Sequence, residues 1–371
     1  MTKPTMKDIC NTPGDDARFD SSGCIFKEKI YPFIYPARGE GGGYTRLFKV
    51  LLTNICENNC LYCVNRKDRN KKNYIFSPKE LALRFMNYYK GKMADGLFIS
   101  SGIYRNSDTT QERIIETVKI LRERYKYKGY IHTKILPDAS PDLIREAVPF
   151  SNRISVNLEA PGDNYLAKLS KEKNFTNLIS TLRAIANARN EKRQRYMPYF
   201  SITTQFVIGA AGENDLCLLT LSKRLYRDFG LSRVYYSGFS PEPDTPLDNK
   251  SPCPIHRIRR LYQADFLIRK YNFDPREIVP SGFLPDIDPK LSWARSHPEL
   301  FPVEINTASY DELIRVPGIG LITARRILRA RKDKRFISPD DTKKIGVRGH
   351  KYVDFLIFNG KYYGNLLVTN S

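Results

Sequence analysis

The sequence lacks any uncharged apolar run near the ~18 residues that a membrane-spanning helix needs. Its first ten residues, MTKPTMKDIC, also lack the basic and then apolar layout of a signal peptide. Low-complexity tracts are missing, and a hydrophobic content of 41% excludes a disordered chain, a collagen and a coiled coil. The 371 residues therefore predict a soluble, cytoplasmic protein with a sizeable core and no membrane partner.

Acidic residues are scarce beside basic ones. The chain has 40 Asp and Glu against 61 Lys and Arg, which gives a net charge of +21 and a pI near 9.6. Such an excess favours a polyanionic partner such as nucleic acid, although a solvated basic surface would have the same composition.

Cysteine is also infrequent, and the seven cysteines are an odd number. Three of them fall within residues 56–63. This distribution argues against a disulfide framework and favours a metal or redox site in a reducing compartment.

Short apolar runs alternate with amphipathic stretches over residues 46–240. The runs are rich in Ile, Val and aromatic residues, as buried parallel strands are. They predict strands at Phe48–Leu52, Gly96–Ser100, Tyr130–Leu136, Arg153–Glu159, Phe200–Ile208 and Arg233–Phe239. Helices are predicted from Ser77-Pro78, from Ser140-Pro141 and around Ile114–Leu121, Leu178–Ile185 and Leu216–Tyr226. This alternation predicts an α/β fold, a parallel sheet or partial (βα)6 barrel, with chemistry at the carboxyl ends of the strands.

Four parts of the chain follow from these patterns. Residues 1–45 are predicted to form an irregular N-terminal extension, and residues 46–250 the core barrel. Residues 251–300 contain a basic amphipathic helix, Ile255–Tyr271, and a Pro-rich connector typical of a domain boundary. Residues 301–371 are predicted to form a small, separate, all-α unit.

Cys56, Cys60 and Cys63 lie in one loop directly after the first predicted strand, with the spacing CxxxCxxC. Such a loop can direct three thiolates to one centre and leave one corner of a cubane iron–sulfur cluster open for a ligand. The alternative, a structural zinc site, normally has four ligands, and the nearest histidine in the sequence is His132. The spacing therefore favours an iron–sulfur cluster.

With Tyr62 before the third cysteine, this segment resembles the signature of the radical S-adenosylmethionine (radical SAM) superfamily. The resemblance covers residues 45–250. It implies a partial TIM-like barrel and a 4Fe–4S cluster on Cys56, Cys60 and Cys63, with S-adenosyl-L-methionine (SAM) on the open iron. Reductive cleavage of SAM would give a 5′-deoxyadenosyl radical that abstracts hydrogen from a substrate.

Four later segments, each at the end of a predicted strand, strengthen the resemblance. Ser100-Ser101-Gly102 stands where the superfamily has Gly-Gly-Glu, and Asn157-Leu158-Glu159 is similar to the ribose-binding Asn-Leu-Asp of biotin synthase. The turn 209–213 resembles Gly-Leu-Pro-Gly-Glu near adenine, and residues 241–247 resemble Pro-x-Pro-Gly-Thr-Pro-Leu with Asp244 in place of Gly. The resemblance implies cofactor binding by Ser100, Ser101, Gly102, Asn157, Glu159, Gly209, Gly212 and Glu213. For Glu159, a helix cap is the alternative.

A second signal lies near the C-terminus. Thr307 can cap a short helix, and Pro317-Gly318-Ile319-Gly320 predicts a tight turn into a second helix, whose first N–H groups suit a phosphate. The segment resembles the helix-hairpin-helix motif, and Ile345–Gly349 a degenerate second hairpin. The motif implies sequence-independent contact with a nucleic-acid backbone by Pro317, Gly318, Ile319, Gly320, Thr323, Arg325, Arg326 and Lys332, with Arg329 and Arg331 adding charge. A protein–protein hairpin is the alternative.

Other features leave their interpretation open. The basic segments Arg122–Tyr130, Arg189–Tyr196 and His256–Arg260 suit a nucleic-acid path or ordinary helix ends equally well. Cys217 falls in an apolar helical pattern and is predicted to be buried. Cys10, Cys24 or Cys253 could donate a hydrogen atom or close over the site.

Together, the two modules resemble radical SAM proteins predicted to modify or repair DNA. This resemblance implies an enzyme that binds nucleic acid, DNA ahead of RNA, and directs a radical at a flipped or single-stranded base or sugar. It also implies a reductant such as flavodoxin or ferredoxin, and a uracil-DNA-glycosylase-like partner. Two alternatives remain: an enzyme that modifies tRNA or another RNA, and an iron–sulfur DNA-binding protein that senses redox state without turnover.

Overall fold

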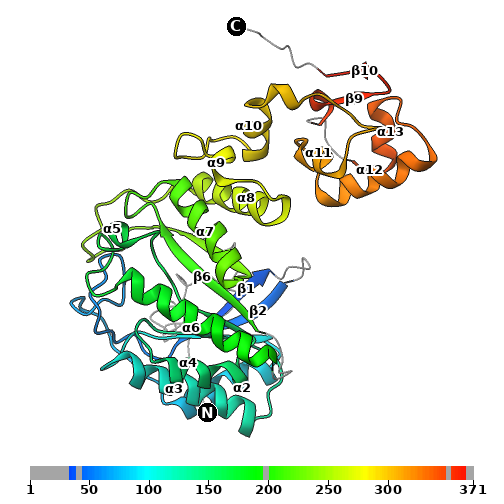
Figure 1. The fold of residues 1–371 in the computed structure, drawn as a ribbon. Coiled ribbons are helices and arrows are strands. Elements are labelled where there is room, and N and C mark those ends of the chain that lie inside the picture. Colours follow the sequence, from blue (N-terminus) through cyan, green and yellow to red (C-terminus); the bar gives the residue numbers. More distant parts are fainter. Residues whose placement is uncertain (1–32, 39–43, 195–199, 348–351, 365–371) are drawn as a thin grey trace. The chain divides into compact units, whose positions relative to one another are not determined.

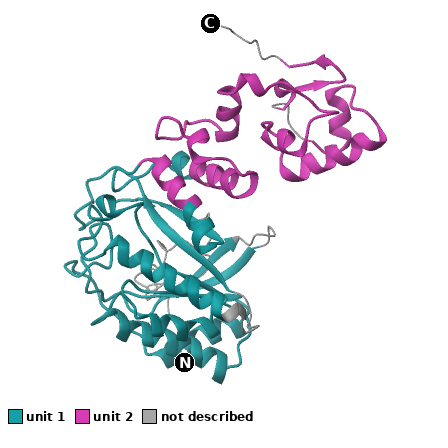
Figure 2. Cartoon of the chain, in the orientation of Figure 1, with its two compact units in different colours: residues 1–213, 224–258 teal, residues 214–223, 259–371 magenta. Residues whose placement is uncertain are grey.

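The computed structural model describes residues 33–38, 44–194, 200–347 and 352–364 (Figure 1). The chain divides into two compact units, the first made of residues 1–213 and 224–258 and the second of residues 214–223 and 259–371 (Figure 2). The domain boundaries expected from the motifs, after residues 45, 250 and 300, remain predictions. Over the described ranges, no helix is both long and apolar enough to cross a bilayer.

A seven-stranded sheet forms the centre of the first unit. Its strands follow the order of the sequence: β1 (Ile34–Arg38), β2 (Tyr44–Leu51), β3 (Gly96–Ser100), β4 (Tyr130–Lys134), β5 (Arg153–Ser155), β6 (Ser201–Ile208) and β7 (Arg233–Gly238). Strands β2 to β7 are parallel, which confirms the six predicted strands. The sheet stays open between β1 and β7 and curls into the predicted half barrel (Figure 1).

Strand β1 corrects the expectation that residues 1–45 are irregular throughout. It pairs antiparallel with β2 and buries Ile34 and Tyr35. Pro36 interrupts the strand pattern in the sequence, but an edge strand tolerates a residue without an N–H group. Residues 1–32, with Cys10 and Cys24, lie outside the described residues.

Helices follow the strands of the first sheet, as predicted. They are α2 (Pro78–Lys90), α3 (Ser107–Lys119), the π-turn η3 (Ile120–Arg124), α4 (Pro141–Ala147), η4 (Val148–Phe150), α5 (Asp163–Leu166), α6 (Phe175–Gln194) and α7 (Asp215–Phe229). Ser77 caps α2 in a capping box with Glu80. Alternate strand residues such as Phe48 and Val50 pack with Leu81 of α2 in one core cluster. This packing fills the convex face of the sheet and leaves the concave face for a site.

Helix α8 (Ile255–Tyr271) has the predicted bounds and belongs to the second unit from Arg259 on. The Pro-rich stretch after it is more than a connector, because its prolines begin the short helices α9 (Pro275–Ile278), α10 (Pro289–Arg295) and η5 (Pro298–Leu300). Further helices are α11 (Tyr310–Arg315), α12 (Leu321–Asp333), α13 (Pro339–Lys344) and η6 (Val353–Phe355). The prediction of helices alone omitted a small sheet of β8 (Val303–Glu304), β9 (Leu356–Phe358) and β10 (Lys361–Tyr362). Such short strands leave no visible alternation in the sequence.

Candidate active site and nucleic-acid interface

The loop after β2 carries the three clustered cysteines and lies along the end of β3. Gly102 N donates to Thr53 O and Glu57 N donates to Ile103 O, each over 2.8 Å. A Cβ at position 102 would lie 2.3 Å from the Ile55 carbonyl oxygen, so this approach requires glycine. Gly102 therefore positions the cysteine loop against the sheet.

All three cysteines of the loop are free thiols, with Cys60 buried and Cys56 and Cys63 half-buried. Cys60 Sγ lies 3.3 Å from Ser170 Oγ, and Asn65 N donates to Cys63 Sγ over 3.4 Å. Burial raises the pKa of the Cys60 thiol, and it raises the pKa of Cys63 to about 12. A coordinating thiol is deprotonated, so metal binding here must displace protons.

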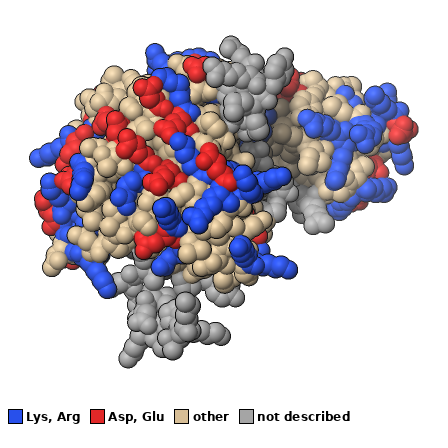
Figure 3. All heavy atoms as spheres, turned by 90° about the horizontal axis from the view of Figure 1, so that it is seen from below, with Lys and Arg blue, Asp and Glu red and all other residues tan. Residues whose placement is uncertain are grey.

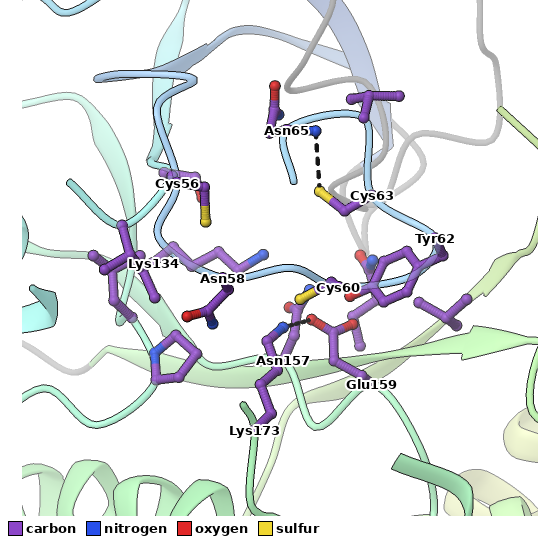
Figure 4. A pocket seen from close by; sticks show the side chains of 18 of the residues that line it. Cys56, Asn58, Cys60, Tyr62, Cys63, Asn65, Lys134, Asn157, Glu159 and Lys173 are labelled. Atoms are coloured by element: carbon purple, nitrogen blue, oxygen red, sulfur yellow. Dashed lines mark hydrogen bonds and ion pairs between the residues drawn. The ribbon is translucent and has the colours of Figure 1, made fainter. Parts of the chain in front are cut away.

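A cavity opens among the cysteines at the carboxyl ends of the strands (Figure 4). Five of the predicted cofactor residues line it, namely Ser100, Ser101, Gly102, Asn157 and Glu159. Polar residues of the lining that the sequence analysis missed include Lys134, Lys173 and Gln205. Lys134 ends β4, where the strand-end rule could have found it. Lys173 lies in the loop between α5 and α6 and belongs to no motif.

Glu159 stands in the cavity wall with a φ of +62°, a conformation that costs free energy for any residue but glycine. Its Oε1 accepts a hydrogen bond from Lys173 Nζ over 2.8 Å, whereas its buried Oε2 has no partner in the described structure. Although burial opposes it, the Glu159 carboxylate raises the pKa of Lys173 well above its usual value. The N-cap of α5 is Gly162, which removes the helix-cap alternative for Glu159.

Gly209, Gly212 and Glu213 form a turn after β6 and do not line this cavity. The Glu213 carboxylate accepts hydrogen bonds from Gly209 N over 2.6 Å and from Ala211 N over 3.2 Å. Glu213 thus fixes its own turn, and the cofactor role of these three residues stays a prediction. Asp244 has a φ of +59°, which explains why glycine is usual at this position of the resembling loop.

Helices α11 and α12 enclose the predicted turn, in which Gly318 has a φ of +85°. Ser309, and not Thr307, caps α11, because Ser309 Oγ accepts from Glu312 N while the Glu312 carboxylate accepts from Ser309 N. Thr307 and Ser309 both precede the helix, but only Ser309 has a Glu three residues later to complete a capping box. The prediction for Thr307 is therefore wrong.

The side chains of α12 divide into a buried face and a cationic face. Ala324 and Ile327 are buried. The exposed basic residues are Arg325, Arg326, Arg329 and Lys332, and Thr323 is half-buried. On the face seen in Figure 3, Lys and Arg side chains gather on the C-terminal part of the chain. Pro317 and Ile319 are buried, so the turn can offer a ligand its backbone but not these side chains.

Two residues outside the motif hold this turn. Lys290 of α10, only 7% exposed, donates to Ile319 O over 2.6 Å, and its Nζ lies 4.9 Å from the centre of the Tyr271 ring. The Tyr271 hydroxyl accepts a hydrogen bond from the N–H of Leu321, the first residue of α12. Burial lowers the pKa of Lys290 to about 7. Neither residue carried a signal in the sequence.

Basic residues elsewhere have structural partners. Arg331 donates to the carbonyls of Ile305 and Ala308, Arg122 to those of Phe150, Tyr127 and Gly129, and Arg189 to those of Phe229 and Gly230. Arg257 donates to the Glu213 carbonyl. These contacts agree with the structural alternative, and a nucleic-acid path along these segments stays a prediction. Residues 195–199 and 348–351 of the predicted segments lie outside the described ranges.

Two further cysteines fall within the described residues. Cys217 is half-buried, so the prediction that it is buried is wrong. Cys253 packs against the turn after β6. A Cβ added to Gly209 of this turn would lie 2.9 Å from the Cβ of Cys253.

Two parts of the chain match known protein families. Residues 50–221 match the radical SAM superfamily, and residues 301–353 match the helix-hairpin-helix motif. The part of the chain with the cysteine cavity is thus similar to the radical SAM superfamily, and the C-terminal part carries a match to the helix-hairpin-helix motif.

Two curated proteins are similar to this chain. A threonylcarbamoyladenosine tRNA methylthiotransferase of Thermotoga maritima is 23% identical over 232 residues, which are 60% of this chain and 50% of the relative. A 7,8-didemethyl-8-hydroxy-5-deazariboflavin synthase of Methanosarcina barkeri is 24% identical over 271 residues, 67% of this chain and 74% of the relative. The chain thus spans about half the length of the methylthiotransferase. Neither name refers to DNA, so the resemblance to DNA-modifying or repair proteins is not confirmed.

Among solved structures, methylornithine synthase matches 58% of this chain and 60% of its own, with 17% identity and a TM-score of 0.48.

Radical SAM enzymes use a 4Fe–4S cluster and SAM, and the cavity fits both. Three buried oxygen atoms of its lining, Asn65 Oδ1, Ser101 Oγ and Glu159 Oε2, lack partners in the described structure, as expected where a polar ligand belongs. Over the described residues, no three His, Cys, Asp or Glu side chains surround a single metal ion. A cubane cluster instead takes one thiolate on each of three separate irons, which three spaced thiols can supply, and its fourth iron stays open.

Proposed function

We propose that this protein is a radical SAM enzyme that modifies nucleic acid, with tRNA or another RNA as its substrate. The observation that carries the proposal is the presence, in one chain, of the cysteine-lined cavity and a hairpin whose second helix exposes a row of cations. The net charge of +21 agrees with a polyanionic partner. The tRNA methylthiotransferase among its relatives favours RNA.

In this proposal, the first unit binds the cofactors and the second unit binds the nucleic acid. Cys56, Cys60 and Cys63 would hold the cluster, and Asn157 and Glu159 would bind the sugar of SAM. When bound, cluster and SAM supply a 5′-deoxyadenosyl radical. The hairpin turn and α12 would bind backbone phosphates through N–H groups and cations. A base inside a stack cannot reach the cavity, so the target is flipped or single-stranded.

DNA is the second candidate, and the hairpin itself favours it. Backbone contacts through N–H groups and arginines carry no sequence information and suit a duplex. A uracil-DNA-glycosylase-like partner belongs to this candidate. For either polymer, flavodoxin or ferredoxin is the proposed electron donor.

The test is release of 5′-deoxyadenosine by full-length, anaerobically reconstituted and reduced protein, with tRNA, single-stranded DNA, duplex DNA or no polymer. Stimulation by tRNA supports the proposal, and stimulation by DNA alone transfers it to the second candidate. If no polymer changes release and none binds with salt-sensitive affinity, nucleic acid is the wrong substrate class.

A further inference from the structure

Residues 169–172, between α5 and α6, lie against the cysteine loop. Leu61 N of the loop donates to Leu169 O over 2.8 Å. Next to this contact, Cys60 Sγ lies 3.3 Å from Ser170 Oγ. Cys60 and Ser170 are 110 positions apart in the sequence, so the fold alone brings this hydroxyl to the sulfur.

The Ser170 hydroxyl reaches Cys60 from outside the cysteine cavity. Both residues are buried, with Ser170 1% exposed and Cys60 6% exposed. Cys60 lines the cavity, whereas Ser170 is not part of its lining. A ligand that fills the cavity therefore leaves the contact between this hydroxyl and the sulfur in place.

The Ser170 hydroxyl has a second partner, the Glu172 carboxylate. Ser170 Oγ donates to Glu172 Oε2 over 2.9 Å, while the Cys60 thiol donates to Ser170 Oγ. Glu172 is exposed, and its Oε1 accepts a hydrogen bond from Asn59 N over 3.2 Å. A serine hydroxyl carries a single hydrogen, so Ser170 must choose between the sulfur and the carboxylate as its acceptor.

The preferred acceptor changes when Cys60 binds iron, because a coordinating thiol has lost its proton. The Cys60 sulfur is then an acceptor in a buried position, where a polar atom without a partner costs free energy. The exposed Glu172 carboxylate keeps Asn59 N and solvent as donors when Ser170 turns away. The Ser170 hydrogen therefore stabilises the protein more at the sulfur than at the carboxylate.

We propose that Ser170 is a positioning residue whose hydroxyl donates to the Cys60 sulfur when the cluster is bound, and that this hydrogen bond raises the reduction potential of the cluster. Reduction adds one negative charge, which a hydrogen bond to a ligand sulfur stabilises. Asn65 N donates to Cys63 Sγ in the same way, but a backbone donor cannot be removed by substitution. The inference rests on the cluster of the proposed function and does not depend on which polymer is the substrate.

The experiment is a redox titration of full-length, anaerobically reconstituted protein without SAM or nucleic acid, followed by the EPR signal of the reduced cluster. Ser170→Ala removes the donor, so the equilibrium constant for reduction should fall about tenfold, which is ~59 mV to more negative potential for a one-electron couple. Ser170→Thr keeps a hydroxyl and should retain the potential of the unaltered protein. Ser151→Ala is the matched control, because Ser151 is also buried but donates to Ala147 O and lies outside the cavity lining.

A second pair of variants tests the same hydrogen without a change in the core. Glu172 and Glu57 are both exposed residues beside the cluster cysteines, but Glu57 pairs with Lys67 and Glu172 with Ser170. An amide oxygen competes less than a carboxylate for the hydroxyl hydrogen. The potential should therefore rise more in Glu172→Gln than in Glu57→Gln, although each variant removes one negative charge.

A more negative potential in Ser170→Ala alone, with Ser170→Thr and Ser151→Ala unchanged, supports the inference. An unchanged or less negative potential in Ser170→Ala, or an equal drop in Ser170→Thr or Ser151→Ala, overturns it and leaves the proposed function intact. If Ser170→Ala takes up no cluster, the glutamate pair decides, and equal rises in Glu172→Gln and Glu57→Gln overturn the inference. Failure of the unaltered protein to take up a cluster contradicts the proposed function, and the inference with it.

Discussion

The cysteine loop and the hairpin turn both depend on a glycine, Gly102 beside the loop and Gly318 within the turn, but they present different parts of the chain to a ligand. The cysteine loop presents three thiols, and Gly102, just after β3, only allows the backbone of the loop to come close. The second buries Pro317 and Ile319 and presents backbone groups beside the exposed cations of α12. A site built from side chains can be recognised in the sequence by its residue types. A site built from backbone groups can be recognised there only by its glycines and prolines. Variants that disable one turn and spare the other test this difference.

The largest effect is expected from Cys60→Ala. Because Cys60 is one of the three proposed cluster ligands, its loss should reduce 5′-deoxyadenosine release to background. Salt-sensitive nucleic-acid binding by the hairpin should persist, as measured by anisotropy. Cys217→Ala, which removes a half-buried thiol outside the loop, is the control and should retain both properties. Parallel loss of release and binding in Cys60→Ala would mean that the two turns are not separable.

The next effect concerns the support of the cysteine cavity. Lys173→Met leaves the buried Glu159 carboxylate without its cation and should destabilise the first unit by about 3–5 kcal/mol in denaturant unfolding. The double variant Glu159→Gln, Lys173→Met should recover much of this loss, because no charge is left buried. Lys171→Met, an exposed neighbour, should stay within about 0.5 kcal/mol. A double variant as unstable as the single one would contradict the pairing.

The hairpin offers the reciprocal experiment. Gly318→Ala meets no steric obstacle, since the nearest atom to its Cβ is 3.6 Å away, but it must adopt a φ of +85°. The strain of about 1–2 kcal/mol should distort the turn and weaken nucleic-acid binding about tenfold, with cleavage of SAM alone unchanged. Gly360→Ala has a similar φ of +77° and open space around it. Gly360→Ala should therefore lose similar stability without losing affinity for nucleic acid. Equal nucleic-acid affinities in the two variants would contradict the assignment of the hairpin as the binding site.

The sequence predicted those features of the two sites that depend on neighbouring residues in the chain. Cysteine spacing, strand-end polar residues and the Pro-Gly-Ile-Gly turn all fall within short segments, and the six parallel strands followed from apolar runs. What it missed depends on contacts between distant segments. Lys173 reaches Glu159 from another loop, and Lys290 and Tyr271 reach the hairpin from α10 and α8. The wrong cap at Thr307 has a local cause, since two hydroxyl residues compete within three positions.

The smallest effect tests whether Lys290 supports the hairpin turn, as Lys173 supports the wall of the cysteine cavity. Its pKa is about 7 in the folded chain and 10.5 when exposed, so between these values the unfolded chain binds more protons. Stability of the second unit should therefore rise with pH from about 7 to 10.5, by at most about 1.4 kcal/mol per pH unit from this group. Lys290→Met should remove that rise, and exposed Lys270→Met should not. Trp293, the single tryptophan of the chain, lies on α10 with Lys290, so its fluorescence reports unfolding of this unit. An identical pH slope in Lys290→Met and in the unaltered protein would show that the buried amine is not held as the structure places it.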